Sequence, residues 1–166
     1  MVFREHPSRV VRMVDGQLVA YPSATDEDCT LWFALADEPG EWEGILGKRR
    51  SEDTAEVVGV PVFIYDVGLG DVVRTIKSDE GAGVVTEIVA GGGNYTFRAF
   101  FERASFAGEH WKRLMSDLER FGCWFDTWSE TVVAISADAV NSQAVADYLA
   151  DRENRGELRY ETARSR

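Results

Sequence analysis

The order of predicted elements over residues 96–162 constrains the fold of this chain more than any other stretch. It reads as strand, helix, strand, strand, helix and strand. The apolar residues of the first helix recur at spacings of three and four and therefore share one face: Trp111, Leu114, Met115, Leu118 and Phe121. This order is typical of a split βαβ unit. We therefore expect a ferredoxin-like sandwich, with both helices on one face of a four-stranded antiparallel sheet.

Local signals mark the limits of these elements. Gly122 follows the last apolar residue of the first helix, where a residue able to take a positive φ commonly ends a helix. The run 131–137 is β-branched and almost wholly apolar, as in a central strand covered by helices. Asn141 is the predicted N-cap of the second helix, with Asp138 as the alternative, and Gly156 is its predicted stop.

The N-terminal half is dominated by short apolar runs separated by turns rich in glycine and proline. In the run 60–65 we expect an extended segment with Phe63 and Tyr65 on one side, followed by a tight turn at Gly68 and Gly70. Such a series of strands predicts a small barrel or a half-open sheet. The chain then divides into three parts: a partly irregular leader at 1–29 with a hairpin turn at Asp15-Gly16, a small β unit at 30–92, and the ferredoxin-like α+β unit at 93–163.

The charge balance bounds the kinds of partner. The chain has 18 Lys and Arg against 29 Asp and Glu, a formal net charge of −11. A chain this acidic has no general attraction for nucleic acid or for an anionic membrane surface, and its field favours a basic partner. The alternative interpretation is that the charge serves solubility alone.

The N-terminal residues lack the apolar core of a signal peptide, and no run reaches the length of a transmembrane helix. We therefore expect a cytoplasmic protein. Cys29 and Cys123 form no CxxC pair, and we expect reduced thiols, with Cys123 packed as a small buried hydrophobe.

Catalytic and metal-binding patterns are weak. His6 and His110 are far apart and neither has a partner at ligand spacing, so we expect no metal site. His6 falls in the leader, where we expect it to be mobile. The GLGDVV motif lacks the third glycine and the following helix of a dinucleotide site, so we expect no cofactor. Asp66 and Asp71 flank that turn and are either a carboxylate pair for acid–base chemistry or, as we favour, turn-capping residues.

Aromatic residues give the richer signal in the C-terminal half. Trp124 and Trp128 share one face of a predicted strand, opposite Phe125. That face is either covered by the N-terminal β unit as an interdomain core, which we favour, or exposed as a protein-binding surface. RNA binding by base stacking is disfavoured because the strand carries Asp126 and is followed by Glu130 rather than by basic residues.

Two motifs carry a resemblance to a known family. They are an aromatic and glycine-rich element followed by a Gly-x-x-Thr element: Pro61, Phe63, Tyr65, Gly68, Leu69, Gly70, Asp71, Val72 and Val73, with Gly93, Asn94 and Thr96. Over residues 30–163 the chain resembles the uncharacterised bacterial family called domain of unknown function 4265. The resemblance implies a shared fold and no established reaction. Asn94-Tyr95 replaces the usual His or Ser, which argues against a catalytic histidine there.

We therefore expect a non-enzymatic protein-binding module in the bacterial cytosol. An immunity or antitoxin-type inhibitor of a basic toxin would match the small size, the acidity and the aromatic face. The alternative is a small-ligand binder or an enzyme with its site at the junction of the two units, around Tyr65, Asp66, Asp71 and Asn94. A homodimer built through the sheet face or a free strand edge is compatible with either.

Overall fold

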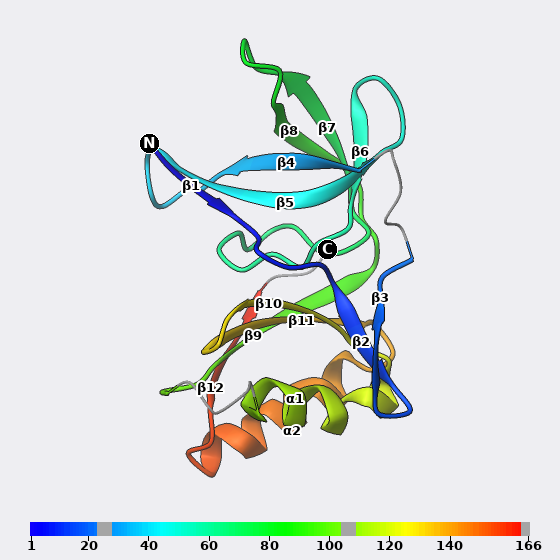
Figure 1. Cartoon of the computed structure of the whole chain (residues 1–166), viewed down its shortest axis with the longest axis vertical. Coiled ribbons are helices and arrows are strands. Elements are labelled where there is room, and N and C mark those ends of the chain that lie inside the picture. The colour runs from blue at the N-terminus through cyan, green and yellow to red at the C-terminus, as the bar shows by residue number, and fades with distance from the viewer. Residues whose placement is uncertain (23–27, 104–108, 164–166) are drawn as a thin grey trace.

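The computed structural model describes residues 1–22, 28–103 and 109–163, and it contains two six-stranded sheets in separate layers (Figure 1). The first sheet lies at the top of Figure 1. The second lies below it, and the helices cover the face of the second sheet that points away from the first. The protein is therefore an α+β fold that is mostly β.

The first sheet closes into a five-stranded barrel. Its strand order is β1-β5-β4-β8-β7-β6, and β5 also pairs with β6. This additional pairing closes the five strands β4, β5, β6, β7 and β8 into a circle. The strands are β1 (Val2–Glu5), β4 (Asp28–Ala34), β5 (Glu41–Arg49), β6 (Thr54–Val57), β7 (Val72–Lys77) and β8 (Gly83–Ala90). Strand β1 lies outside the circle, parallel to the first half of β5. The expectation of a small barrel is confirmed.

Glycines in β5 allow its neighbour to pack across it. A Cβ on Gly44 would lie 2.6 Å from the Trp32 ring, and one on Gly47 would lie 2.4 Å from Leu31 Cδ1. These side chains of β4 can therefore lie directly over the β5 backbone. Leu31 and Ile45 are fully buried and form the barrel core together with Val57 and Val73.

The second sheet is antiparallel throughout, in the order β12-β9-β11-β10-β2-β3. Its strands are β2 (Val11–Val14), β3 (Gln17–Ala20), β9 (Asn94–Phe100), β10 (Trp124–Ser129), β11 (Val132–Asp138) and β12 (Arg159–Ala163). The predicted leader hairpin is confirmed, with Asp15 and Gly16 both at positive φ (50° and 77°), as a two-residue hairpin turn requires. The hairpin extends the sheet beyond β10.

The helices pack on one face of this sheet. They are α1 (Glu109–Asp117), the short 3₁₀ helix η2 (Glu119–Phe121) and α2 (Ser142–Asn154). Leu114, Met115, Val145 and Leu149 meet sheet residues such as Phe97 in one buried cluster. Gly122 takes a φ of 64°, as predicted for the end of the first helical segment. Asn141 occupies the N-cap position of α2 but makes no side-chain cap bond, and instead donates from its backbone and side chain to Asp138.

One local prediction was wrong. Residues 60–65 do not form an extended strand-like segment, because their amide groups bond to carboxylate side chains rather than to a neighbouring strand. The β10–β11 turn lies at residues 130–131. Among the helices in the described part of the chain, none is both long enough and apolar enough to cross a membrane.

Candidate functional site

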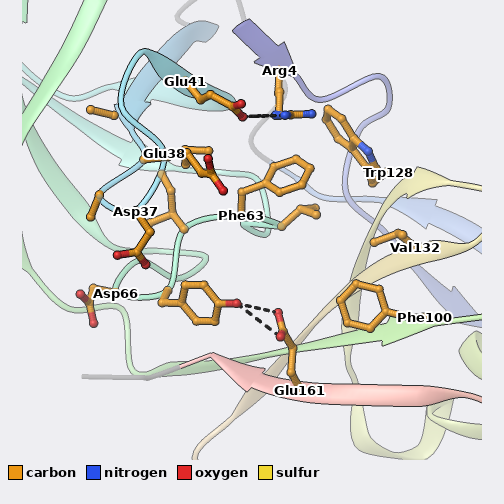
Figure 2. A pocket seen from close by; sticks show the side chains of 16 residues that line it. Arg4, Asp37, Glu38, Glu41, Phe63, Asp66, Phe100, Trp128, Val132 and Glu161 are labelled. Carbon is orange, nitrogen blue, oxygen red and sulfur yellow. Dashed lines mark hydrogen bonds and ion pairs between the residues drawn. The ribbon is translucent and has the colours of Figure 1, made fainter. Parts of the chain in front are cut away.

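A hollow of about 740 Å³ lies at the junction of the barrel and the second sheet (Figure 2). Its walls come from β1, the β4–β5 turn, the irregular segment 62–66, and strands of the second sheet. Each sheet alone would present only part of this surface, so the packing of the two units creates the hollow.

The side chains around the hollow are of two main kinds. Four are aromatic: Phe63, Tyr65, Phe100 and Trp128. Five are acidic and only Arg4 is basic; the acidic residues are Asp37, Glu38, Glu41, Asp66 and Glu161. Concave walls lined with one sign of charge concentrate the field in the space between them. The hollow therefore combines apolar stacking surfaces with a negative potential.

Two of the five carboxylates are paired with arginines of the chain. Arg4 donates to Glu41 Oε2 from Nη2 at 2.6 Å and from Nε at 3.0 Å, and its guanidinium carbon lies 5.1 Å from the Phe63 ring centre. Arg98 donates from Nη1 to Glu161 Oε1 at 3.0 Å. In both cases the guanidinium is held by a carboxylate and an aromatic ring together, because Arg98 also lies 4.5 Å from the centre of the Tyr65 ring.

Arg98 is the more deeply placed of the two arginines. Its side chain has no exposed surface, and it donates to the backbone carbonyls of Pro61 and Ile64 as well as to Glu161. The Tyr65 hydroxyl donates to Glu161 at 3.3 Å. Arg98 thus attaches the segment 61–65 to β9 and, through Glu161, to β12.

The other three carboxylates at the hollow are Asp37, Glu38 and Asp66. All three are exposed, and none forms a salt bridge within the described residues. An exposed, unpaired carboxylate is available to a cationic group from outside at little desolvation cost.

A buried charge cluster supports the wall of the hollow. His6 Nε2 lies 2.7 Å from Glu43 Oε1, and His6 Nδ1 lies 2.7 Å from Asp126 Oδ2. The exposed fractions of the three side chains are 4% for His6, 0% for Glu43 and 1% for Asp126. Since both ring nitrogens face carboxylates, both carry a hydrogen, and the ring is an imidazolium. The expectation that His6 is mobile was wrong.

The environment of His6 shifts its pKa strongly. Burial acts to lower the pKa, but hydrogen bonds to Asp126 and Glu43, together with their charges, outweigh burial and raise the pKa to about 9. The ring is therefore charged at neutral pH. A carboxylate on each side of the ring is the arrangement that allows a cation to be buried.

The same carboxylates fix the backbone that lines the hollow. Glu43 accepts hydrogen bonds from the amides of Val62, Phe63 and Ile64 at 2.6, 3.0 and 2.9 Å. Asp126 Oδ2 accepts from the amide of Val60 at 3.0 Å. The backbone amides of Val60 and of residues 62–64 are thus satisfied without a partner strand. The cluster holds Phe63 in position above the hollow.

The structure brings only three of the predicted site residues to the hollow. Tyr65, Asp66 and Trp128 line it. Trp128 contacts Phe63 and His6 edge-on, with ring centres 5.0 and 5.6 Å apart. Trp128 therefore lies between the buried cluster and the hollow.

Trp124, on the same strand, packs away from the hollow. Its ring meets Tyr21 edge-on at 4.8 Å, and Arg12 lies over it at 4.6 Å. Both tryptophans are half-buried against the cluster between the two sheets, which includes Val10, Val60 and Leu69. The interdomain-core interpretation of this strand face is thereby supported.

Asp71 and Asn94 lie at the Gly68–Gly70 turn instead of the hollow. Asp71 accepts from the amide of Gly68 at 2.9 Å through Oδ2 and from the amide of Gly92 at 2.7 Å through Oδ1. Asn94 donates to the carbonyl of Leu69 at 2.7 Å. Asp71 thus stabilises the turn, as the favoured interpretation held, while Asp66 is exposed at the hollow and is not paired with it.

Cys123 and His110 do not line the hollow. Burial raises the pKa of Cys123 to about 12, and its thiol belongs to the core beneath the helices. His110 stacks on Phe101 with ring centres 5.0 Å apart. Across residues 1–22, 28–103 and 109–163, no group of three or more His, Cys, Asp or Glu is arranged to hold a metal ion.

Sequence reasoning missed Glu43, Asp126 and Arg98 as organising residues. A usable signal was present for one of them. Arg98 occupies a strand position between Phe97 and Ala99. An ionisable residue between apolar neighbours in a strand indicates a buried partner elsewhere in the chain.

Comparison with known proteins identifies the family. The family model described as domain of unknown function (DUF4265) matches residues 43–160, which is more than half of the chain. The chain belongs to this family. The match includes Glu43, Asp126 and the segment 62–66, whereas Arg4 and His6 precede it.

A solved structure shares the fold. It is described as a novel crystal structure of a hypothetical protein from Neisseria gonorrhoeae, and it superimposes with a TM-score of 0.66. The alignment covers 84% of this chain and 94% of that one at 14% sequence identity. At this identity the likeness concerns the fold alone. A search of curated proteins gave no match.

Proposed function

We propose that this protein is a non-enzymatic binding module that holds a basic protein partner at the hollow. The observation that carries the proposal is the composition of the hollow, with five acidic side chains and one basic one around four aromatic rings. Aromatic residues are enriched at the centres of protein interfaces, and complementary charge steers the approach of a partner. The net charge of −11 also favours a basic partner.

A concrete form of this proposal is an immunity or antitoxin-type inhibitor. A nuclease-like toxin binds phosphates and therefore presents a basic active site. An acidic module that occludes such a site would neutralise the toxin without chemistry of its own. A homodimer remains compatible with this role, because the hollow is formed within one chain.

The test is a pull-down from the native host with matched variants. The hollow variant carries Asp37→Asn, Glu38→Gln and Asp66→Asn. The control carries Glu52→Gln, Glu80→Gln and Glu130→Gln, which are exposed positions outside the hollow and change the net charge equally. We expect a stoichiometric partner that the wild type and the control retain and the hollow variant loses. Equal loss from both variants would contradict a role for the hollow.

A second candidate function is the binding of a small cationic ligand. The volume of about 740 Å³ falls within the usual range for small-molecule sites. Of the residues expected at such a junction site, Tyr65 and Asp66 lie at the hollow. A ligand that binds only the folded protein raises its melting temperature. A thermal-shift screen with spermidine, agmatine and choline tests this candidate, which fails if no compound stabilises the wild type more than the hollow variant.

We also propose that residues 93–163 form a ferredoxin-like unit that the leader hairpin extends. The strand order β12-β9-β11-β10 and the two helices on one face support this classification. Strand contacts in solution test it. We expect nuclear Overhauser effects between Phe97 and both Thr162 and Ile135, which are its register partners on β12 and β11. A different neighbour for β9 would overturn the classification.

A further inference from the structure

We propose that the hollow recognises the planar guanidinium group of an arginine side chain presented by the partner. This inference rests on the proposed function and names the chemistry that the hollow selects. It separates an arginine-specific site from a surface that attracts any positive charge.

The chain's own arginines show how the hollow holds a guanidinium. Arg4 lies over Phe63 and bonds to Glu41, and Arg98 lies over Tyr65 and bonds to Glu161. The same combination of one aromatic face and one carboxylate therefore occurs twice in the wall. A guanidinium is planar and weakly hydrated, so it can stack on a ring while its edge donates to a carboxylate.

The hollow also contains aromatic rings and carboxylates that hold no arginine of the chain and can bind an incoming side chain. No arginine or lysine of the described chain lies over Phe100 or Trp128, and Asp37, Glu38 and Asp66 form no salt bridge there. Figure 2 shows these carboxylates on one side of the hollow and the two aromatic rings on the other, with Phe63 between them. A side chain that enters the hollow therefore faces carboxylates on one side and aromatic rings on the other, the two kinds of group that hold Arg4 and Arg98.

Lysine matches this arrangement less well. Its ammonium group is compact and strongly hydrated, and it cannot stack as a plane against a ring or bond a carboxylate with two parallel donors. The geometry of the internal pairs therefore points to arginine. A neutral isostere of arginine should not bind, because the unpaired carboxylates would gain no compensating charge.

The experiment compares three short peptides of one sequence that differ only at two positions, which carry arginine, lysine or citrulline. Binding to the full-length protein is measured by calorimetry, and the site is located from the indole resonances of the five tryptophans, with Trp128 assigned by Trp128→Phe. We expect the arginine peptide to bind about tenfold tighter than the lysine peptide and to shift the Trp128 signal. We expect no binding of the citrulline peptide.

Each other outcome has a defined meaning. Equal affinity for the arginine and lysine peptides would overturn the arginine inference and leave the basic-partner proposal standing. Arginine binding that survives in the Asp37→Asn, Glu38→Gln, Asp66→Asn variant would also overturn it, because the hollow would not be the site. If no peptide binds while the pull-down partner still depends on the hollow, the arginine inference fails alone. The Glu52→Gln, Glu80→Gln, Glu130→Gln control should bind like the wild type.

Discussion

His6 and Glu43 are joined by a 2.7 Å contact between Nε2 and Oε1 in a region from which solvent is almost wholly excluded. The contact connects the residue that follows β1 to the middle of β5, and Asp126 on β10 completes the cluster from the second sheet. A single imidazolium therefore joins the leader, the barrel and the second sheet. Because Glu43 also holds the segment 62–64, the cluster determines the shape of the hollow.

Replacing His6 with glutamine should destabilise the protein strongly. The substitution removes the cation and leaves two buried carboxylates facing each other, and breaking a buried pair costs about 3–5 kcal/mol. The free energy of unfolding from urea titration measures the loss. His110→Gln is the matched control, since His110 is exposed, and it should change stability by less than about 1 kcal/mol. A loss below about 1 kcal/mol for His6→Gln would contradict a buried, charged His6.

Stability should also fall at alkaline pH. The pKa of His6 in the folded protein is about 9, above the ordinary histidine value of 6.5. The stabilisation is therefore fully present below about pH 6.5 and is lost as the pH rises through about 9, with a total of about 3 kcal/mol. Unfolding titrations at pH 6, 8 and 10 measure this change. In the His6→Gln variant, the free energy of unfolding should depend less on pH between 6 and 10. The same pH dependence in the variant and the wild type would contradict the assignment of this effect to His6.

The interaction between His6 and Glu43 can be isolated with a double-mutant cycle. His6→Gln removes the cation and leaves Glu43 and Asp126 without it, whereas Glu43→Gln removes one carboxylate and leaves His6 paired with Asp126. The double variant removes both partners of the His6–Glu43 contact. We expect the double variant to be more stable than the sum of the single losses implies, by about 1–3 kcal/mol. Urea unfolding of the four proteins measures the coupling. Simple additivity would show that the two side chains act independently.

The elements that sequence alone could predict are those with local causes. The first helical segment ends at Gly122 because a residue with a positive φ is needed there, and the leader hairpin turns at Asp15-Gly16 for the same reason. The apolar stripe of α1 and the branched residues of β11 likewise follow from periodicity within a few residues. The barrel was predictable from the series of short strands and turns.

The hollow and its support could not be predicted, because their causes are not local. His6 and Asp126 are 120 positions apart, and no local pattern around His6 indicates that its ring binds a distant carboxylate. The segment 60–65 alternates like a strand, but its amides bond to Glu43 and Asp126. Tyr65 and Trp128 were selected for their chemistry, and only the packing of the two sheets brings them to one site.

Arg4 offers a direct test of how the hollow holds a cation. It covers Phe63 and neutralises Glu41, so it occupies one place where a partner's guanidinium could lie. Arg4→Ala should expose both groups and increase affinity for the arginine peptide by about threefold, the size expected from one half-exposed cation–π contact. The stability cost should stay below about 1 kcal/mol, since 36% of the Arg4 side chain is exposed.

The matched control for this prediction is Arg9→Ala, which removes the same charge. Arg9 is 57% exposed, pairs with Asp28 and does not line the hollow. Calorimetry with the arginine peptide should therefore show a gain for Arg4→Ala that clearly exceeds any gain for Arg9→Ala. Equal gains would mean that the total charge of the protein, and not the hollow, sets the affinity. A loss of affinity in Arg4→Ala would mean that Arg4 shapes the site, and the incoming cation would then have to bind between the remaining carboxylates and Trp128.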